Sequence, residues 1–185
     1  MRNVFACLSI LLCLSGPVLA SEQAPRTERL DNLFSDLKRT ANASAARRIA
    51  GRISAIFAES DSATVDLLME RAAKGIEDKK YDLALDMLDQ VIMLDPAYAE
   101  GWNRRATVNF LMKNYAKAMA DIERVLELEP RHFGAMVGLA AILRAENKDE
   151  SALGVYERAL EVYPMMREAQ EAVGKLADKL AGEPI

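Results

Sequence analysis

The sequence is poor in the residues that most often build catalytic and metal centres. Its 185 residues include two cysteines and a single histidine, His132. A structural zinc site needs about four cysteine or histidine ligands, and a histidine base needs a positioned partner within hydrogen-bond reach. The chain also lacks a glycine-rich phosphate loop and a nucleophile elbow. We therefore expect no metal, no cofactor and no enzymatic activity, and a His132 that hydrogen-bonds nearby backbone.

Aromatic residues, proline, glycine and positive charge are scarce as well. Aromatics make up 6% of the chain, which has 6 prolines and 9 glycines. Sheet proteins use more aromatic, β-branched and turn-forming residues, so this composition favours helices. Lys and Arg total 24 against 28 Asp and Glu, which leaves no cationic surplus to replace the counterions of a phosphate backbone. Nucleic acid is not an expected partner, whereas the 51% hydrophobic content is enough for a packed core.

The chain begins with the pattern of a signal peptide in residues 1–20. Arg2 supplies a positive n-region, and residues 4–14 form an uncharged, mostly apolar run that is too short to cross a bilayer. A Ser-Gly-Pro break follows, and the modest side chains of Val18 and Ala20 predict cleavage after Ala20. The alternatives are a buried N-terminal helix and a lipoprotein signal that uses one of the two cysteines.

Both cysteines, Cys7 and Cys13, lie inside this segment. The mature chain would then be secreted without any disulfide and would be stabilised by packing alone. No later apolar run is long enough to span a bilayer. The expectation is therefore a secreted protein with no integral membrane segment in its mature part.

An internal repeat dominates the rest of the chain. Identical or similar residues recur 34 positions apart across three units, 65–98, 99–132 and 133–166. The positions that keep the same residue are Pro96, Pro130 and Pro164; Ala84, Ala118 and Ala152; and Ala72, Ala106 and Ala140. A fixed period of about 20–50 residues is the signature of a repeat array, whose units bury their apolar faces by stacking on one another.

The pattern within one unit is that of a helical hairpin. Ala106 and Ala118 of the second unit are small enough to let two antiparallel helices approach closely. Pro130 lacks an amide hydrogen and disfavours helix in the residue before it, so the second helix is expected to stop near Glu129. Each unit is therefore predicted to be helix–turn–helix.

The period and these residues resemble the tetratricopeptide repeat. The match is closest in 99–132, where Trp102 stands at the tryptophan position of that family and Tyr115 starts the second helix. The resemblance implies an all-α fold, an α-solenoid of antiparallel helix pairs (TPR superhelix), and a role in protein–protein interaction. The chain is similar to small exported members from Gram-negative envelopes, which act as adaptors or chaperones, and this implies the periplasm as its location.

The turn inside each unit departs from the family pattern. A glycine is common there, and this chain has Lys79, Lys113 and Asn147 instead. Asparagine tolerates the left-handed backbone conformation, and lysine does so less well. The departure bears on the geometry of the turn and not on the fold.

Helical patterns extend the array of 61–166 on both sides. Residues 21–26 are expected to be a flexible leader, and residues 27–60 a degenerate N-terminal helical hairpin. On the 34-residue period Phe34 falls at the tryptophan position, which favours a further repeat, and a separate hairpin is the alternative. Residues 167–181 are expected to form a capping helix with one apolar and one charged face.

Ligands of the family bind along a concave groove lined by the first helix of each repeat. Mapped by repeat phase, the groove of this chain comprises Asp66, Met69, Ala73, Glu77, Glu100, Asn103, Thr107, Phe110, Leu111, Val137 and Arg144. Burial between repeats is an equal alternative for its apolar members. The lysine–asparagine set with which chaperone-tail-binding members grip a terminal carboxylate is missing, and only Asn103 with Arg104 or Arg144 offers part of it. The expected ligand is therefore an apolar helix or extended segment of a protein partner.

Four other interpretations stay open at this stage. The chain could self-associate through its terminal helices as a structural subunit of an envelope assembly, which the charged face of the last helix disfavours. A carboxylate-based hydrolase is a remote alternative, since surface acids alone do not define a catalytic pair. Arg47, Arg48 and Arg52 could bind an acidic partner or headgroups, although a solvated helix face is the simpler interpretation. The methionines are expected to fill the core rather than to bind copper.

Overall fold

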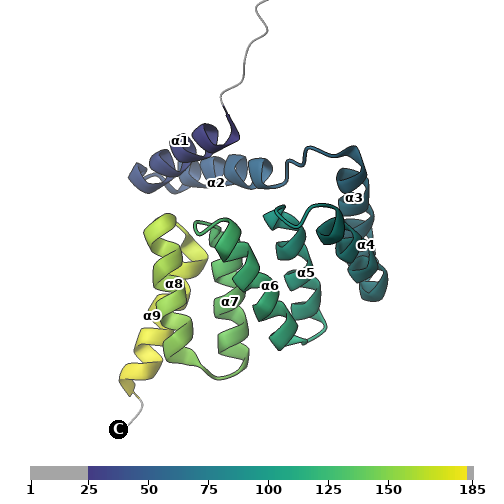
Figure 1. Ribbon diagram of the computed structural model, residues 1–185. Helices are drawn as coiled ribbons and strands as arrows, with labels where there is room; N and C mark the ends of the chain where they lie inside the picture. Colours follow the sequence, from purple (N-terminus) through teal and green to yellow (C-terminus); the bar gives the residue numbers. More distant parts are fainter. Residues whose placement is uncertain (1–24, 183–185) are drawn as a thin grey trace, which may run out of the picture.

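The computed structural model describes residues 25–182, and within that range the chain forms nine α-helices and no strands. Their bounds are α1 Arg26–Arg39, α2 Ala43–Phe57, α3 Ala63–Glu77, α4 Tyr81–Leu94, α5 Ala99–Leu111, α6 Tyr115–Leu128, α7 Phe133–Ala145, α8 Asp149–Val162 and α9 Arg167–Gly182. Helices α3 to α9 stand side by side as a stack of helix pairs, and α1 and α2 lie across the upper ends of α7 and α8 (Figure 1). The predicted all-α solenoid of antiparallel helix pairs is confirmed. The predicted signal peptide and most of the predicted leader lie outside the described residues.

Small residues at the helix crossings explain why the helices pair as they do. The alanines that recur every 34 residues are all buried, with at most 3% of their surface exposed: Ala72, Ala84, Ala106, Ala118, Ala140 and Ala152. Gly75 of α3 lies so close to α4 that a Cβ added to it would sit 3.2 Å from Cβ of Ala84. A larger side chain at these positions would force the two helices of a hairpin apart.

In each of the three repeats, the turn between the paired helices has one residue in the left-handed conformation. The φ angle is 58° at Lys79, 61° at Lys113 and 58° at Asn147. The amide after each of these residues donates to a carbonyl five residues earlier, at 2.8 Å in all three turns. This is the six-to-one bond of a Schellman helix end. The turns therefore have the geometry that glycine favours, and each lysine adopts it at a steric cost of roughly 1–2 kcal/mol.

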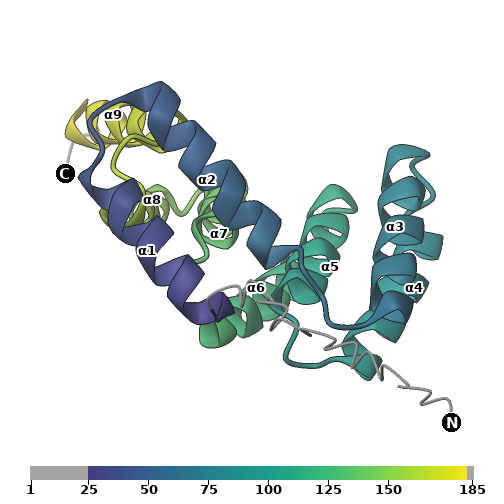
Figure 2. The same cartoon turned by 90° about the horizontal axis from the view of Figure 1, so that it is seen from above.

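The N-terminal hairpin does not continue the stack of repeats. Helices α1 and α2 pack on each other, and the main contact of the hairpin with the helices of the array is that of α1 with α8. Seen from above, the hairpin crosses the ends of α6, α7 and α8, while α3 and α4 stand clear of it (Figure 2). The expectation that the hairpin of 27–60 follows the 34-residue period as a further repeat is therefore corrected. It is a separate hairpin.

The position of the hairpin follows from where its two apolar stripes are buried. One cluster combines Leu30, Leu33, Phe34, Leu37, Ile53, Ile56 and Phe57 of the hairpin with Tyr163 and Met166, and Phe133 packs against it. Tyr163 and Met166 belong to the linker that joins α8 to α9, and Phe133 follows the linker that joins α6 to α7. The hairpin thus covers the edge of the array along which one repeat connects to the next, and we call this edge the linker edge.

Polar contacts fix the hairpin on the linker edge. Oη of Tyr98, in the linker before α5, donates to the carbonyl of Ala58 at 2.9 Å. Arg131, in the linker before α7, pairs with Asp31 of α1 at 2.7 Å. Its guanidinium carbon also lies 4.2 Å from the ring centroid of Phe34, a cation–π arrangement. The hairpin therefore ties together linkers that lie on either side of the second repeat.

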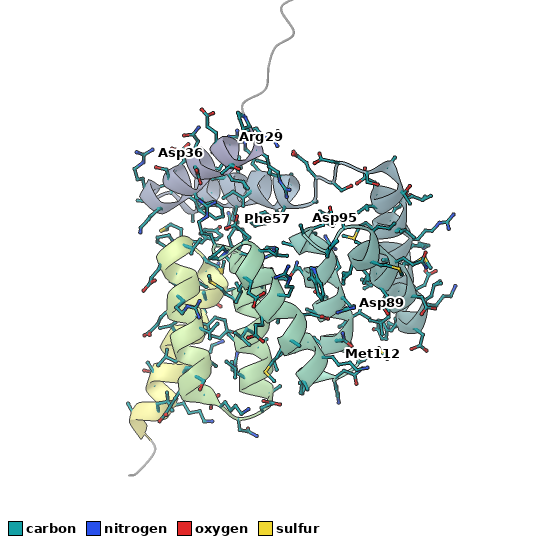
Figure 3. All side chains as sticks on the ribbon, in the orientation of Figure 1. Arg29, Asp36, Phe57, Asp89, Asp95 and Met112 are labelled. Atoms are coloured by element: carbon teal, nitrogen blue, oxygen red, sulfur yellow. The ribbon has the colours of Figure 1, made fainter. Side chains whose placement is uncertain are left out.

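The histidine of the chain lies at the centre of this contact. Phe57 at the end of α2 faces the array (Figure 3), and its ring stacks on His132 with centroids 4.6 Å apart and 12° between the planes. His132 is 4% exposed, and its Nδ1 accepts from the amide of Ala135 at 3.0 Å, which caps α7. The backbone bond expected of His132 is confirmed. Its burial beneath Phe57 was not predicted, because the two residues are far apart in sequence.

Candidate partner-binding face

The predicted groove residues lie on the first helices of the three repeats. Along α3 and α5 they recur mostly three or four positions apart, and the two residues of α7 are seven positions apart, which places them on one side of each helix. We call this surface the first-helix face: Asp66, Met69, Ala73 and Glu77 of α3; Glu100, Asn103, Thr107, Phe110 and Leu111 of α5; and Val137 and Arg144 of α7.

The α3 part of the face is mostly open to solvent. Asp66, Ala73 and Glu77 are exposed, whereas Met69 is half-buried and packs against two apolar clusters. The Asp66 carboxylate accepts from Oγ of Ser60 at 2.6 Å, and Glu77 accepts from Nζ of Lys74 at 3.2 Å. This part of the face therefore presents two exposed acids around a small apolar surface.

The α5 part contains a connected set of polar side chains. Glu100 is 7% exposed, and its two carboxylate oxygens accept from Nε of Arg104 at 2.6 Å and from Nδ2 of Asn103 at 2.9 Å. Thr107, one turn further along, is exposed and donates its hydroxyl to the carbonyl of Asn103 at 3.0 Å. The amide group of Asn103 is therefore already engaged with a neighbouring acid of its own helix.

The charge of Glu100 is held by its surroundings. Since Nδ1 of His132 accepts a backbone bond, the ring proton resides on Nε2, which lies 3.5 Å from Oε2 of Glu100 without a hydrogen-bonding geometry. Burial by itself raises the pKa of Glu100, but the side chains of His132 and Arg104 outweigh it and hold that pKa below its ordinary value. Burial, with the nearby charge of Glu100, in turn raises the pKa of Tyr98 to about 12.

The remaining predicted residues divide between surface and core. Phe110 is half-buried, with its ring tilted on Tyr115 at a centroid distance of 5.8 Å, and Leu111 beside it is 44% exposed. Val137 is half-buried and packs against the cluster that includes the hairpin. Arg144 is exposed at the far end of α7. The face is thus open along Ala73, Thr107 and Leu111 and partly occupied by core contacts on α7.

Sequence reasoning missed the contribution of α9. Lys175 and Lys179 stand one 34-residue period after Ala141 and Ala145, so they extend the first-helix face to a fourth helix. Together with Arg144 they line an open pocket of about 500 Å³, in which Lys179 pairs with Asp149. One further step along the period would have found them. The face is therefore acidic on α3 and basic where α7 meets α9.

A second polar cluster, also missed, joins the first two repeats. Arg105 of α5 bonds to Asp121 of α6 at 2.6 Å and to Asp89 of α4 at 2.7 Å, and Asn109 donates to Asp121 at 3.2 Å. Asp89 lies where α4 meets α5 (Figure 3). Bonding to Asp121, which is 3% exposed, raises the pKa of Arg105 against the opposing effect of burial. The cluster crosses the interface between the first two repeats, and its position indicates that it holds them together.

Residues 25–182 contain no group of three or more His, Cys, Asp or Glu side chains arranged to hold a metal ion. In the same range, no helix is both long and apolar enough to cross a membrane.

The sequence matches known proteins over most of its length. The model of the tetratricopeptide repeat family matches residues 99–132. A TPR repeat-containing protein of Rhizobium etli is 54% identical over 155 residues, which cover 84% of this chain and 76% of that protein. The rice DnaJ protein P58IPK homolog B is 34% identical over 90 residues, and this match spans 49% of this chain and only 19% of that protein.

Solved structures show the same architecture. The first TPR domain of Spaghetti (RPAP3), bound to the HSP90 peptide SRMEEVD, matches with a TM-score of 0.62 and 30% identity, over 66% of this chain and 97% of that one. The MamA protein matches with a TM-score of 0.58 over 84% of this chain and 82% of that one, and at 16% identity it shows the fold alone.

Proposed function

Because the chain belongs to the tetratricopeptide repeat family, we propose that it is a non-enzymatic protein–protein interaction module, an adaptor or chaperone-like scaffold, of the bacterial periplasm. The first-helix face binds a helix or an extended segment of the partner. The observation that carries this proposal is the open strip formed by Ala73, Thr107 and Leu111 on adjacent first helices, with charged side chains on both sides of it.

The charges on the first-helix face determine which kind of partner segment it can bind. The related RPAP3 domain binds a peptide that ends in acidic residues. In this chain Asn103 is committed to Glu100, and Asp66 and Glu77 add negative charge on α3. An acidic segment would be repelled there, because like charges brought close cost free energy. The face therefore favours a segment with apolar side chains at its centre and basic ones at the end that meets α3.

Photo-crosslinking tests this assignment directly. A crosslinking residue at Thr107 should capture the partner, and one at Glu123, which is exposed on α6, should not. Thr107→Arg places a bulky charge on the open strip without disturbing a buried group, so it should abolish capture by a crosslinker at Ala73. Glu123→Arg is the matched control. Equal capture from Thr107 and Glu123, or capture that survives Thr107→Arg, would exclude the first-helix face.

The periplasmic location rests on the leader pattern of residues 1–20. Fusion of the full chain to a phosphatase that folds only after export should give an active enzyme. Replacement of the apolar run by charged residues should abolish that activity and leave the fusion inside the cell. Cleavage directly before one of the two cysteines, with lipid attached to that cysteine, would instead support the lipoprotein alternative, and an inactive fusion with an intact leader would support the buried-helix alternative.

A further inference from the structure

The outer side of the first repeat exposes large apolar side chains. Exposed fractions are 47% for Leu67 of α3 and 47%, 76% and 57% for Leu83, Met93 and Leu94 of α4. Leu83, Met93 and Leu94 recur at helical spacing on one side of α4, as do Asp86, Met87 and Gln90 between them. We call this surface the end face, since it is the side of the first repeat turned away from the second.

The other two repeats have different kinds of residue at the same positions. Leu67 corresponds to Gly101 and Ala135, and both are buried; a Cβ added to Gly101 would sit 2.8 Å from Val91 of the preceding repeat. The position of Leu67 is therefore a stacking position. By contrast, Leu83 corresponds to Lys117 and Ser151, and Met93 to Glu127 and Glu161. The first repeat thus places apolar residues at positions where its neighbours place polar ones.

Charged residues on the end face also lack partners. Arg71 stands at the position of Arg105, which bonds to Asp89 on the second helix of the preceding repeat. Within residues 25–182, the side chains of Arg71 and Asp86 make no ion pair or hydrogen bond. Arg71 is therefore a stacking arginine for which no preceding repeat supplies an acid.

We propose that a second copy of this chain covers the end face, in a two-fold dimer with α3 of one protomer against α4 of its partner. The face is self-complementary in charge, with Arg71 on one helix and Asp86 on the other. Gly75 contacts Ala84, so Arg71 and Asp86 lie at levels that differ by about 3 Å along the hairpin. A two-fold axis parallel to the helices brings Arg71 within reach of the partner subunit's Asp86, and the contact occurs twice.

The linker edge and α9 do not expose apolar side chains that could pack against those of the end face. The apolar stripes of α1 and α2 are already buried on the linker edge. On α9 the apolar residues Ala169, Ala172 and Leu176 are buried against α8 and its neighbours, and the opposite side carries charged residues. A head-to-tail stack through α9 would leave Leu67, Leu83 and Leu94 facing polar side chains.

The first test is the mass of the chain in solution, measured by light scattering or sedimentation at concentrations up to about 100 µM. The chain should be a dimer, and Leu83→Glu should convert it to a monomer with unchanged helical content. Leu111→Glu changes a leucine of similar exposure on the first-helix face and should leave the dimer intact. A monomeric parent chain, or a dimer insensitive to Leu83→Glu, would overturn the proposal, as would growth into larger head-to-tail oligomers.

Charge reversal tests the two-fold geometry. Arg71→Glu and Asp86→Arg should each weaken the dimer about tenfold or more, because each creates two like-charge contacts. A mixture of the two variants should form a heterodimer of nearly parental affinity, since both of its contacts pair opposite charges again. A mixture as weak as either variant alone would contradict the pairing. A monomer in which the end face is protected from surface labelling would also overturn the proposal, because another part of the same chain would then cover that face.

Discussion

Among single residues, Glu100 shows how a buried charge can be retained in a helical repeat. It stands in the first turn of α5, where the helix dipole favours a negative charge. Its oxygens are bonded to Arg104 and Asn103, and His132 lies beside them. Because His132 also stacks on Phe57, one ionised group connects the candidate binding face to the docked hairpin.

Replacement of Glu100 should lower the stability of the fold by an amount that depends on pH. Glu100→Gln should lower the free energy of unfolding by about 1–3 kcal/mol at neutral pH, since Arg104 and His132 lose a buried anion. The pKa of Glu100 is held below 4.5 in the folded chain, so the stabilisation is present above that value and is lost as pH falls through the folded pKa.

Urea denaturation between pH 3 and 7 measures this difference. The difference in the free energy of unfolding between the parent chain and Glu100→Gln should become smaller only below pH 4.5, which is the ordinary pKa of a glutamate side chain. Glu123→Gln, at an exposed position, should show no such difference. A difference that is constant with pH would indicate that the variant acts through packing and not through charge.

At the scale of elements, the turns are the places where the sequence departs from the best local choice. Lys113→Gly should raise the free energy of unfolding by about 0.5–1 kcal/mol, because glycine adopts the left-handed conformation without a steric cost. Asn147→Gly should raise the free energy of unfolding by a smaller amount, since asparagine already tolerates that conformation. Lys175→Gly, inside α9, should instead lower stability by about 1 kcal/mol. Chemical denaturation of the three variants gives the comparison, and a destabilised Lys113→Gly would count against the turn geometry.

Phe57 is central to the docking of the N-terminal hairpin, because its ring stacks on His132 of the array. Phe57→Ala should cost about 3 kcal/mol of docking free energy, so backbone amides of α1 and α2 should exchange with solvent faster while those of α5 to α8 keep their protection. Phe110→Ala removes the same ring from a half-buried site away from the hairpin. Hydrogen exchange that is equally fast in the hairpin of both variants would show that Phe57 has no special part in docking.

For the whole molecule, the predictable part of the fold is the part made by neighbouring segments. Ala106 and Ala118 lie in one hairpin, and Pro130 acts on the residue before it, so spacing alone sufficed for the three repeats. The place of α1 and α2 depends instead on Phe57 meeting His132 and on Asp31 meeting Arg131. No local pattern contains such pairs, and Phe34 fits the repeat period by spacing without occupying a repeat position in space.

The first-helix face was likewise predictable only where a residue's position depends on neighbouring segments of the chain. Repeat phase placed Thr107 and Leu111 on an accessible side of α5, where the structure has them. It did not reveal that Glu100 would be buried, because that burial depends on His132 from the next linker. Phase also places Lys175 on the face, although its helix looked like a simple cap.

Removal of the N-terminal hairpin should destabilise the repeat array. A chain that contains only residues 61–185 should melt roughly 5 °C or more below a chain of residues 21–185, because Phe133, Tyr163 and Met166 lose the apolar surface that covers them. Differential scanning calorimetry measures the shift, and dye binding reports the newly exposed apolar area. An unchanged melting temperature would mean that the linker edge needs no cover.

The pair formed by Asp31 and Arg131 spans 100 residues, and this separation matters while the chain emerges, N-terminus first, into the compartment in which it folds. The nascent repeats can assemble in order, since each contacts its neighbour. The hairpin emerges before any of them, yet its docking surface is complete only once Met166 has been added. Until then Leu33, Phe34 and Phe57 are covered only by the other helix of the hairpin, so the hairpin emerges before the repeats but docks after them, and it is the segment most in need of a chaperone.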